Sequence, residues 1–151
     1  MSCGLLNLAM GLQVDKIITS DEQQAAFAIR KQVFVIEQNV DEKEEYDEFE
    51  ATATHFLVRS DGLPVGTARW RFTDKGIKLE RFSVLAEYRG RGVGTAVLRA
   101  MLNDLPAERK LVYLHAQLTA MPLYSKFGFK AVGPQFTECE IEHFKMVLEE
   151  V

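Results

Sequence analysis

The sequence predicts an α+β fold, in which one mixed, mostly antiparallel sheet carries helices on both faces. Its 151 residues have the size of one domain, and 47% hydrophobic with 26% charged residues is an ordinary globular balance. The middle of the chain alternates apolar and polar residues between turns, which is typical of an antiparallel meander. After Gly92 the apolar period changes from 2 to 3.6 residues, which indicates a helix packed against that sheet.

The chain is expected to begin with a strand at 14–18 and a capped helix. A capping box starting at Thr19 or at Ser20 opens this helix, and apolar residues recur at helical spacing to about Ile36. The acid-rich stretch 41–50 follows, with seven acidic residues, one lysine and no apolar stripe. It is expected to form a loop or a short helix.

The rest of the chain supplies the meander and then alternates helices with strands. Asp61-Gly62 and Asp74-Lys75-Gly76 mark the turns of the meander. Pro106 should end the second long helix. The expected strands are 55–59, 65–72, 77–85, 111–116, 127–132 and 144–148, and the expected helices are 93–105 and 120–126.

Composition also excludes several classes of protein. A net charge of −4 is unfavourable for nucleic-acid binding, and no apolar run is long enough to span a bilayer. Cys3 and Cys139 form no disulfide framework, and no three residues have metal-ligand spacing, so we expect a cytoplasmic protein without a metal. Residues 1–12, which lack the features of a secretory signal, are expected to be an N-terminal extension of a single domain at 13–151.

The most informative segment is the glycine-rich loop 84–94, V-L-A-E-Y-R-G-R-G-V-G, which leaves a strand and opens a helix. Its three glycines carry no Cβ, so a ligand can approach the backbone closely. The first amides of the new helix have no internal partner and lie at the positive end of the helix dipole, which suits a diphosphate. Arg89 and Arg91 can add charge-assisted hydrogen bonds.

Two common phosphate-loop patterns do not fit this segment. In the dinucleotide fingerprint G-x-G-x-x-G the last glycine is replaced by Thr95 in one register and by Val97 in the other. The nucleoside triphosphate loop needs G-K-[ST], and no lysine precedes Thr95. What remains is R-x-x-G-x-G at 89–94, for which a plain glycine turn before a helix is the alternative.

With a second motif, this loop resembles the acyl-CoA loop of the GNAT superfamily of N-acetyltransferases. That motif, A-Q-L-T-A-M-P-L-Y-S-K-F-G-F at 116–129, is similar to the family's N-x-x-A-x-x-x-Y-x-x-x-G-F segment, with Gln117 where many members carry Asn. V-F-V-I-E-Q, L-E-R-F-S-V and I-E-H-F-K-M look like the ElaA/YjcF-like branch. His115 and Ser83 depart from it, where Asn and, in some relatives, Cys would be expected.

The resemblance implies a three-layer α/β/α fold whose fourth and fifth strands splay apart around acetyl-CoA. It covers about residues 14–151. The diphosphate would lie on the loop amides and the pantetheine along the preceding strand. The implied cofactor-binding residues are Phe82, Ser83, Val84, Arg89, Gly90, Arg91, Gly92, Val93, Gly94, Thr95, Gln117 and Tyr124.

Acetyl transfer to an amine needs a proton acceptor, an oxyanion donor and a proton donor. An alkyl ammonium, with a pKa near 10.4, must first lose a proton, and a departing thiolate benefits from an acid. By resemblance, Tyr124 is that acid, with core packing as the alternative, and the Val84 N–H is the oxyanion donor. Glu80, acting through water, and His115 are rival bases, but Glu80 can instead form an ion pair with an arginine, Arg69 or Arg81.

The acceptor side is less defined. The branch resemblance points to Glu37, Gln38 and His143. Glu45 and Asp47 of the acid-rich stretch would attract a cationic amine if they line the cleft, whereas a solvated charged face is the alternative.

The leading interpretation is an acetyl-CoA-dependent N-acetyltransferase that moves acetyl directly to a primary amine. The alternatives are a non-catalytic acyl-CoA sensor and a protein-interaction module that uses the acidic stretch. A small amine, an amino sugar, a polyamine and a protein lysine all remain open as acceptor. A homodimer is also left open, and neither nucleic acid nor a membrane is expected as a partner.

Overall fold

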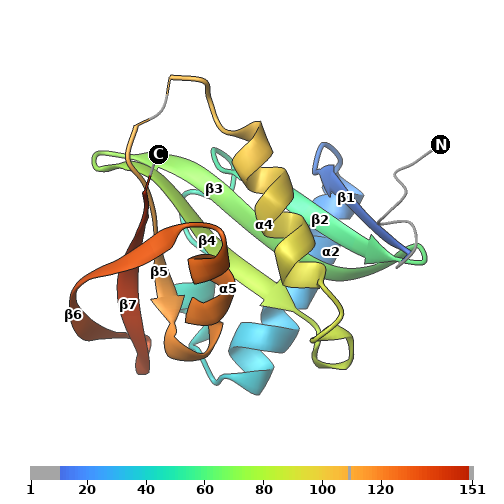
Figure 1. Ribbon diagram of the computed structural model, residues 1–151. Coiled ribbons are helices and arrows are strands. Elements are labelled where there is room, and N and C mark those ends of the chain that lie inside the picture. Colours follow the sequence, from blue (N-terminus) through green and yellow to red (C-terminus); the bar gives the residue numbers. More distant parts are fainter. Residues whose placement is uncertain (1–10, 109, 150–151) are drawn as a thin grey trace.

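Seven strands form one open sheet in the part of the chain that the computed structural model describes, residues 11–108 and 110–149 (Figure 1). The spatial order is β1-β2-β3-β4-β5-β7-β6, in which β4 and β5 are parallel and the other described neighbours antiparallel. This is the expected mixed, mostly antiparallel sheet. The strands are β1 Leu12–Lys16, β2 Thr54–Ser60, β3 Leu63–Thr73, β4 Gly76–Val84, β5 Val112–Gln117, β6 Phe129–Glu138 and β7 Ile141–Leu148.

Helices cover both faces of this sheet. In Figure 1, α4 crosses the sheet in front and α2 lies behind it. None of the described helices is long and apolar enough to cross a membrane. The helical segments are α2 Ser20–Arg30, the π-helix η1 Lys31–Glu37, α3 Glu42–Glu45, the 3₁₀ turn η2 Ala86–Tyr88, α4 Val93–Asp104, the 3₁₀ turn η3 Leu118–Ala120 and α5 Met121–Lys126.

The helix after β1 begins at the first of its two predicted caps. Thr19 Oγ1 accepts the Glu22 N–H at 3.1 Å, and Glu22 Oε1 accepts the Thr19 N–H at 3.1 Å. The helical course continues to Glu37, as expected, but it widens into a π-helix from Lys31 onward. A π-turn frequently marks a functional segment, and Val33 and Phe34 of η1 line the cavity described below.

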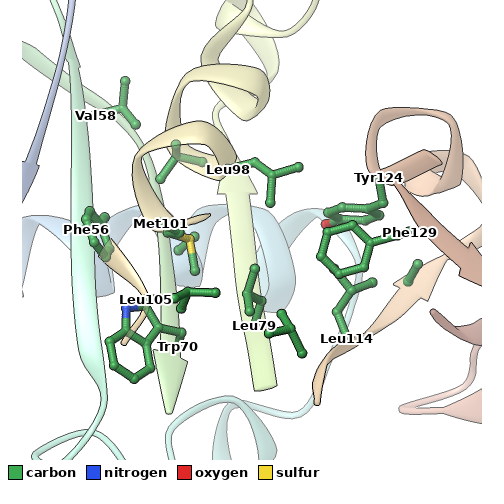
Figure 2. Close-up of a cluster of buried hydrophobic side chains, with 14 of the residues drawn as sticks. Phe56, Val58, Trp70, Leu79, Leu98, Met101, Leu105, Leu114, Tyr124 and Phe129 are labelled. Atoms are coloured by element: carbon green, nitrogen blue, oxygen red, sulfur yellow. The ribbon is translucent and has the colours of Figure 1, made fainter. Parts of the chain in front are cut away.

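Two apolar clusters hold the three layers together. On one face, α4 buries Val97, Leu98 and Met101 against β2, β3 and β4, which contribute Phe56, Trp70 and Leu79 among others (Figure 2). On the other face, α2 and η1 bury a smaller cluster against β2, made of Ala26, Ile29, Val33 and Leu57. Because both faces of the central strands are covered, side chains of β3 and β4 on either face can be held rigidly.

A β-bulge interrupts the pairing of β3 with β4. Thr67 pairs with Ser83 and Arg69 pairs with Glu80, so one β3 residue opposes two β4 residues, Arg81 and Phe82. Arg81 has a φ of 61°, the left-handed conformation that such an extra residue often adopts. Strict alternation would put Glu80 on the same face as Phe82 and Val84, and the bulge changes that relation.

The sheet opens between β4 and β5. Their parallel pairing ends at Leu79 and Leu114, although β4 continues to Val84 and β5 to Gln117. The expected splay of the fourth and fifth strands is thus present, and it creates a cleft in the middle of the sheet.

Some element boundaries differ from the prediction. β6 does not stop at Val132 but passes an irregularity between Val132 and Phe136, and it continues to a two-residue turn at Cys139-Glu140. Both turn residues have positive φ, as a tight hairpin turn requires. The predicted extension 1–12 lies outside the described residues except for Gly11 and Leu12, and Leu12 is the first residue of β1.

Candidate active site

The opened strands enclose a cavity of about 690 Å³. Its lining comes mainly from η1, α3, β4, β5, η3, α5 and the β6–β7 hairpin, with single residues from β3, the glycine-rich loop and α4. The predicted site residues that line it are Gln38, Glu45, Asp47, Glu80, Phe82, Val84, Arg89, Gly94, His115, Gln117, Tyr124 and His143. The predicted site residues that do not line it are Glu37, Ser83, Gly90, Arg91, Gly92, Val93 and Thr95.

The glycine-rich loop lies at one end of this cavity and turns directly into α4. Gly90 and Gly92 have φ values of 77° and 85°, and a Cβ on either would meet no atom within 4 Å. Gly92 is the N-cap of α4 and its carbonyl accepts the first helical hydrogen bond, from Ala96 at 2.9 Å. The amides that follow Gly92 therefore lack helical partners, and the space around the loop is open.

Arg89 ties this loop to both sides of the cleft. Its Nε donates to the Val84 carbonyl at 3.0 Å, and its two outer nitrogens donate to the Glu37 carboxylate at 2.5 and 2.7 Å. The hydrogen bond from Arg89 lowers the pKa of Glu37. Arg91 instead lies over the Tyr88 ring, with 5.1 Å between its Cζ and the ring centroid. Of the two loop arginines, Arg89 is thus held by the cleft and Arg91 by the loop itself.

The peptide groups of Val84 face the open side of β4. The Leu85 N–H donates to the Val65 carbonyl of β3 at 2.9 Å. Since peptide groups alternate in direction along a strand, the Val84 N–H points away from β3 and toward the side on which β5 lies. Ser83, in contrast, is buried, and its hydroxyl donates to the Arg81 carbonyl at 3.3 Å.

Tyr124 reaches this part of β4 from the opposite wall. Its ring packs edge-on against Phe82, with 5.3 Å between the centroids, and also against Phe129 at 6.1 Å (Figure 2). The side chain is buried apart from its share of the cavity lining. Burial raises the pKa of the Tyr124 phenol far above its ordinary value, so the hydroxyl stays protonated at neutral pH. Tyr124 thus packs in the core and also lines the cavity.

A histidine–carboxylate group occupies the β5–β7 wall. His115 Nδ1 lies 3.4 Å from Glu138 Oε2, and His143 Nε2 lies 3.9 Å from Glu138 Oε1. His143 Nδ1 donates to the Ile141 carbonyl at 2.7 Å, and its ring stacks on Phe136. The hydrogen bond from His115 lowers the pKa of Glu138. Glu138 thus joins two predicted site residues, His115 and His143, although no motif in the sequence marks Glu138 itself.

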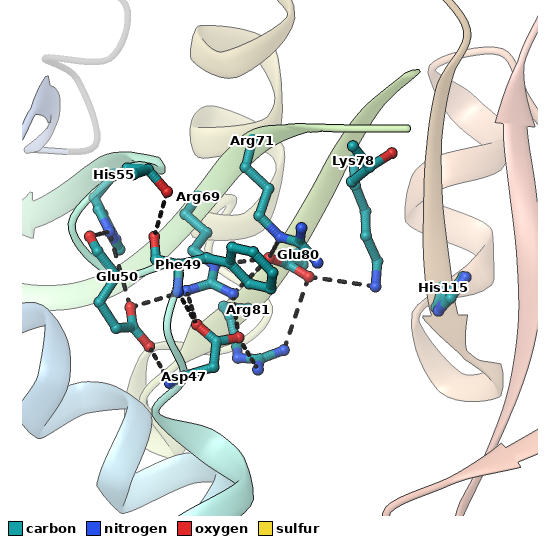
Figure 3. Close-up of polar contacts among 12 residues, drawn as sticks. Asp47, Phe49, Glu50, His55, Arg69, Arg71, Lys78, Glu80, Arg81 and His115 are labelled. Carbon is teal, nitrogen blue, oxygen red and sulfur yellow. Dashed lines mark hydrogen bonds and ion pairs between the residues drawn. The ribbon is translucent and has the colours of Figure 1, made fainter. Parts of the chain in front are cut away.

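The other face of β4 carries a dense cluster of charges (Figure 3). The fully buried Arg69 lies 2.6 Å from Glu80, 2.8 Å from Asp47 and 2.9 Å from Glu50. Burial opposes ionisation of Glu80, but the charge of Arg69 and a hydrogen bond from Arg71 outweigh it and lower the pKa of Glu80 to about 2. We call this cluster the arginine–carboxylate network; its members are Arg30, Glu45, Asp47, Glu50, Arg69, Arg71, Lys78, Glu80 and Arg81.

The inner acids of the stretch 41–50 belong to this network and are not a solvated face. Glu45 is 4% exposed and accepts a hydrogen bond from Arg30 Nε at 2.8 Å. Asp47 accepts from Arg69 and Arg81, and despite its burial these arginines lower its pKa to about 2. Glu45 and Asp47 do line the cavity, but their charges are already matched by arginines.

A pair of amides and an ion pair connect the end of η1 with β5 and with the glycine-rich loop. Gln38 Nε2 donates to Gln117 Oε1 at 3.2 Å, and Gln117 Nε2 donates back to Gln38 Oε1 at 3.0 Å. Glu37 pairs with Arg89 in the same region. Two of the three residues assigned to the acceptor from the branch resemblance, Glu37 and Gln38, therefore contact residues assigned to the cofactor.

Comparison with known proteins decides the family. Residues 17–150 match the family described as "Acetyltransferase (GNAT) domain". The chain belongs to the GNAT family of acetyltransferases. It is 38% identical to the uncharacterized N-acetyltransferase YjcF of Bacillus subtilis over 136 residues, covering 87% of this chain and 96% of that protein. It is 34% identical to the Bacillus subtilis protein YyaT over 143 residues, covering 91% of this chain and 96% of that protein.

A solved structure agrees with this membership. Escherichia coli ElaA superposes with a TM-score of 0.80 at 26% identity, covering 91% of this chain and 99% of that chain. The resemblance to the ElaA/YjcF-like branch and the fold expected from it are thereby confirmed. The family uses an acyl-CoA co-substrate, and the described residues contain no group of three or more candidate metal ligands.

Three charged cavity residues of this GNAT domain, all outside the acid-rich stretch, were not singled out in the sequence. They are Arg71, Lys78 and Glu138. Lys78 lies between two buried residues of its strand, Ile77 and Leu79, which indicates only that its side chain is on the opposite face. Arg71 follows the buried Trp70, which indicates no more. Their meeting at Glu80 depends on the β3–β4 register, which no local pattern encodes.

Proposed function

We propose that this protein transfers an acetyl group from acetyl-CoA directly to a primary amine. The observation that carries the proposal is the shared cavity. Tyr124 and Val84 line the same cavity beyond the point where β4 separates from β5, and the glycine-rich loop with its open helix N-terminus lies at the end of the same strand. This arrangement offers a diphosphate site, an oxyanion donor and an acid along one path.

Each reacting atom then has a partner in the chain. The amine nitrogen attacks the thioester carbonyl carbon, and the Val84 N–H donates to the oxyanion that forms. When the C–S bond breaks, the Tyr124 hydroxyl donates its proton to the departing thiolate, which gives free CoA. The attacking amine loses one proton to the base considered below, and a proton passes from that base through the cavity to the Tyr124 phenolate, so the products are an N-acetyl amine and CoA thiol.

His115 is the proton acceptor that we favour over Glu80. His115 lines the cavity and has a carboxylate partner in Glu138 at 3.4 Å. A histidine held by a carboxylate is a common arrangement for a general base. Glu80 instead forms ion pairs with Arg69 and Arg81. Its pKa of about 2 also makes it a weak base.

The test is an assay of acetyl-CoA turnover with amines, amino sugars, polyamines and lysine peptides as acceptors. The release of CoA thiol measures the rate. Tyr124→Phe keeps the ring packing but removes the acid, so it should lower kcat by about 10²–10⁴-fold and leave the Kd for CoA nearly unchanged. Tyr113→Phe is the matched control, because its hydroxyl pairs with Thr73 at 2.8 Å and its side chain does not line the cavity.

Two results would contradict the proposal. An unchanged kcat in Tyr124→Phe would reduce Tyr124 to a packing residue. Tight acetyl-CoA binding without thiol release over the whole panel would favour the acyl-CoA sensor. The cytoplasmic location stays a prediction, supported by the low cysteine content.

A further inference from the structure

The guanidinium of Arg71 has two outer nitrogens that play no part in the proposed reaction. Its Nε donates to Glu80 at 2.6 Å, and its Cζ lies 3.9 Å from the centroid of the Phe49 ring (Figure 3). These two contacts fix the plane of the guanidinium. Within residues 11–108 and 110–149, no side chain or backbone group accepts a hydrogen bond from its two outer nitrogens, and the residue lines the cavity. A rigid pair of N–H donors is thus available to a ligand.

The charges of the network leave a positive excess at the same place. Arg30, Arg69 and Arg81 lie among Glu45, Asp47 and Glu50, which match them. Arg71 and Lys78 have Glu80 as their partner, at 2.6 and 3.3 Å, and Arg69 shares that carboxylate. The single carboxylate of Glu80 is therefore the partner of two cations, Arg71 and Lys78, that have no other acid within 4 Å in the described part of the chain.

The other acids of the cavity lie farther from these two cations. Glu44 and Glu138 also line the cavity, but in the described part of the chain neither lies within 4 Å of the charged nitrogens of Arg71 or Lys78. Glu138 is instead directed toward His115 and His143. At contact distance, Arg71 and Lys78 are thus matched by the carboxylate of Glu80 alone among the described residues.

The position of this charge separates it from the CoA diphosphate. Lys78 lies six residues before Val84 on β4, and at about 3.3 Å per residue the glycine-rich loop is roughly 20 Å away. Lys78 pairs with Tyr113, and His115 follows two residues later on the same face of β5. An anion bound by Arg71 therefore lies on the side of the favoured base and belongs to the second substrate.

We propose that the acceptor is an amine that also carries a carboxylate, which Arg71 binds through both outer nitrogens with Lys78 as a second cation. This inference rests on the proposed acetyl transfer. A guanidinium with its plane fixed matches the two oxygens of a carboxylate, and such charge-assisted pairs are among the stronger hydrogen bonds in proteins. The acceptor class is then an amino acid or a peptide end with a nearby carboxylate.

The experiment compares amines with and without the carboxylate. Wild-type enzyme is assayed with lysine against cadaverine and with phenylalanine against phenethylamine, and with 2-aminoethyl phosphate as a phosphate probe. We expect kcat/KM to favour the carboxylated member of a pair by about 10–100-fold. Arg71→Gln should abolish that preference mainly through KM, and Arg71→Lys, which keeps the charge but loses the paired donors, should restore part of it.

Arg99→Gln is the matched control, because Arg99 also lies over an aromatic ring, that of Phe127, but outside the cavity. Equal use of both members of each pair, or a preference for the phosphate, would overturn the carboxylate assignment and leave the transferase intact. Acetylation of no amine at all would overturn the proposed function itself. If Arg71→Gln does not fold, the wild-type preference alone decides.

Discussion

The two ends of the cavity differ in the groups that they could offer to a charged ligand. At the glycine-rich loop the groups available are main-chain amides in open space, since Gly90 and Gly92 lie at positive φ and a Cβ on either would have no atom within 4 Å. In the arginine–carboxylate network the groups are side chains, Arg69 is fully buried, and nearly every charge already has a partner. The loop is open for binding, whereas the network is held rigid and leaves one guanidinium end free.

This difference implies that changes at the two ends have different consequences. A side chain added to the loop should block binding without unfolding the protein, because it enters open space and the positive φ adds a strain of only about 1–2 kcal/mol. A charge removed from the network should destabilise the fold, because it leaves buried partners without compensation.

The largest expected effect is that of Gly92→Glu on CoA binding. The new carboxylate would lie next to the diphosphate site at the start of α4, and two like charges about 4 Å apart near a surface repel by about 4 kcal/mol. We therefore expect the Kd for CoA, measured by calorimetry, to rise at least about 100-fold. Gly133→Glu is the control, since Gly133 also has positive φ (76°) and open space but lies on β6. Equal CoA binding by Gly92→Glu and wild type would refute the loop assignment.

The sequence predicted the starts of α2 and α4 and the strand, loop and helix around the glycine-rich segment, because their signals are local. The cap at Thr19, the period of α4 and the glycine spacing each lie within a few residues of what they determine. The network was not predictable in the same way. Asp47, Arg69 and Glu80 come from three segments, and their contact requires the β3–β4 register and the bulge at Arg81. The acid-rich stretch therefore did not reveal that Glu45 and Asp47 pair with arginines, because those arginines are distant in sequence.

The second effect concerns stability and tests the network end. Glu80→Gln leaves Arg69, Arg71 and Lys78 without their shared charge, and removing one member of a buried ion pair typically costs about 3 kcal/mol or more. For a chain of this size that lowers Tm by roughly 6–12 °C. Glu149→Gln, which removes an exposed carboxylate paired with Lys130, should change Tm by less than about 2 °C. If Glu80→Gln lowered Tm by as little as Glu149→Gln, the network would not stabilise the packing of β3 and β4.

The pH dependence of this difference follows from the pKa of Glu80. The folded value of about 2 lies below the ordinary 4.5, so ionised Glu80 stabilises the fold fully above pH 4.5 and loses that effect as the pH falls through 2. The Tm difference between wild type and Glu80→Gln should thus stay constant from pH 7 to about 5 and shrink below 4.5. A difference that vanished already near pH 6 would mean that another group is responsible.

The smallest expected effect joins the two ends of the comparison. Glu37 is an exposed partner of Arg89, and exposed ion pairs contribute about 0.2–1 kcal/mol. If the diphosphate competes with Glu37 for Arg89, Glu37→Gln should tighten CoA binding by about two- to fivefold, with a smaller gain at high salt. Glu87→Gln changes the net charge near the same loop equally, but Glu87 forms no described ion pair with Arg89. Because only the Glu37 variant releases the guanidinium, an equal gain in both variants would indicate general electrostatics and no competition for Arg89.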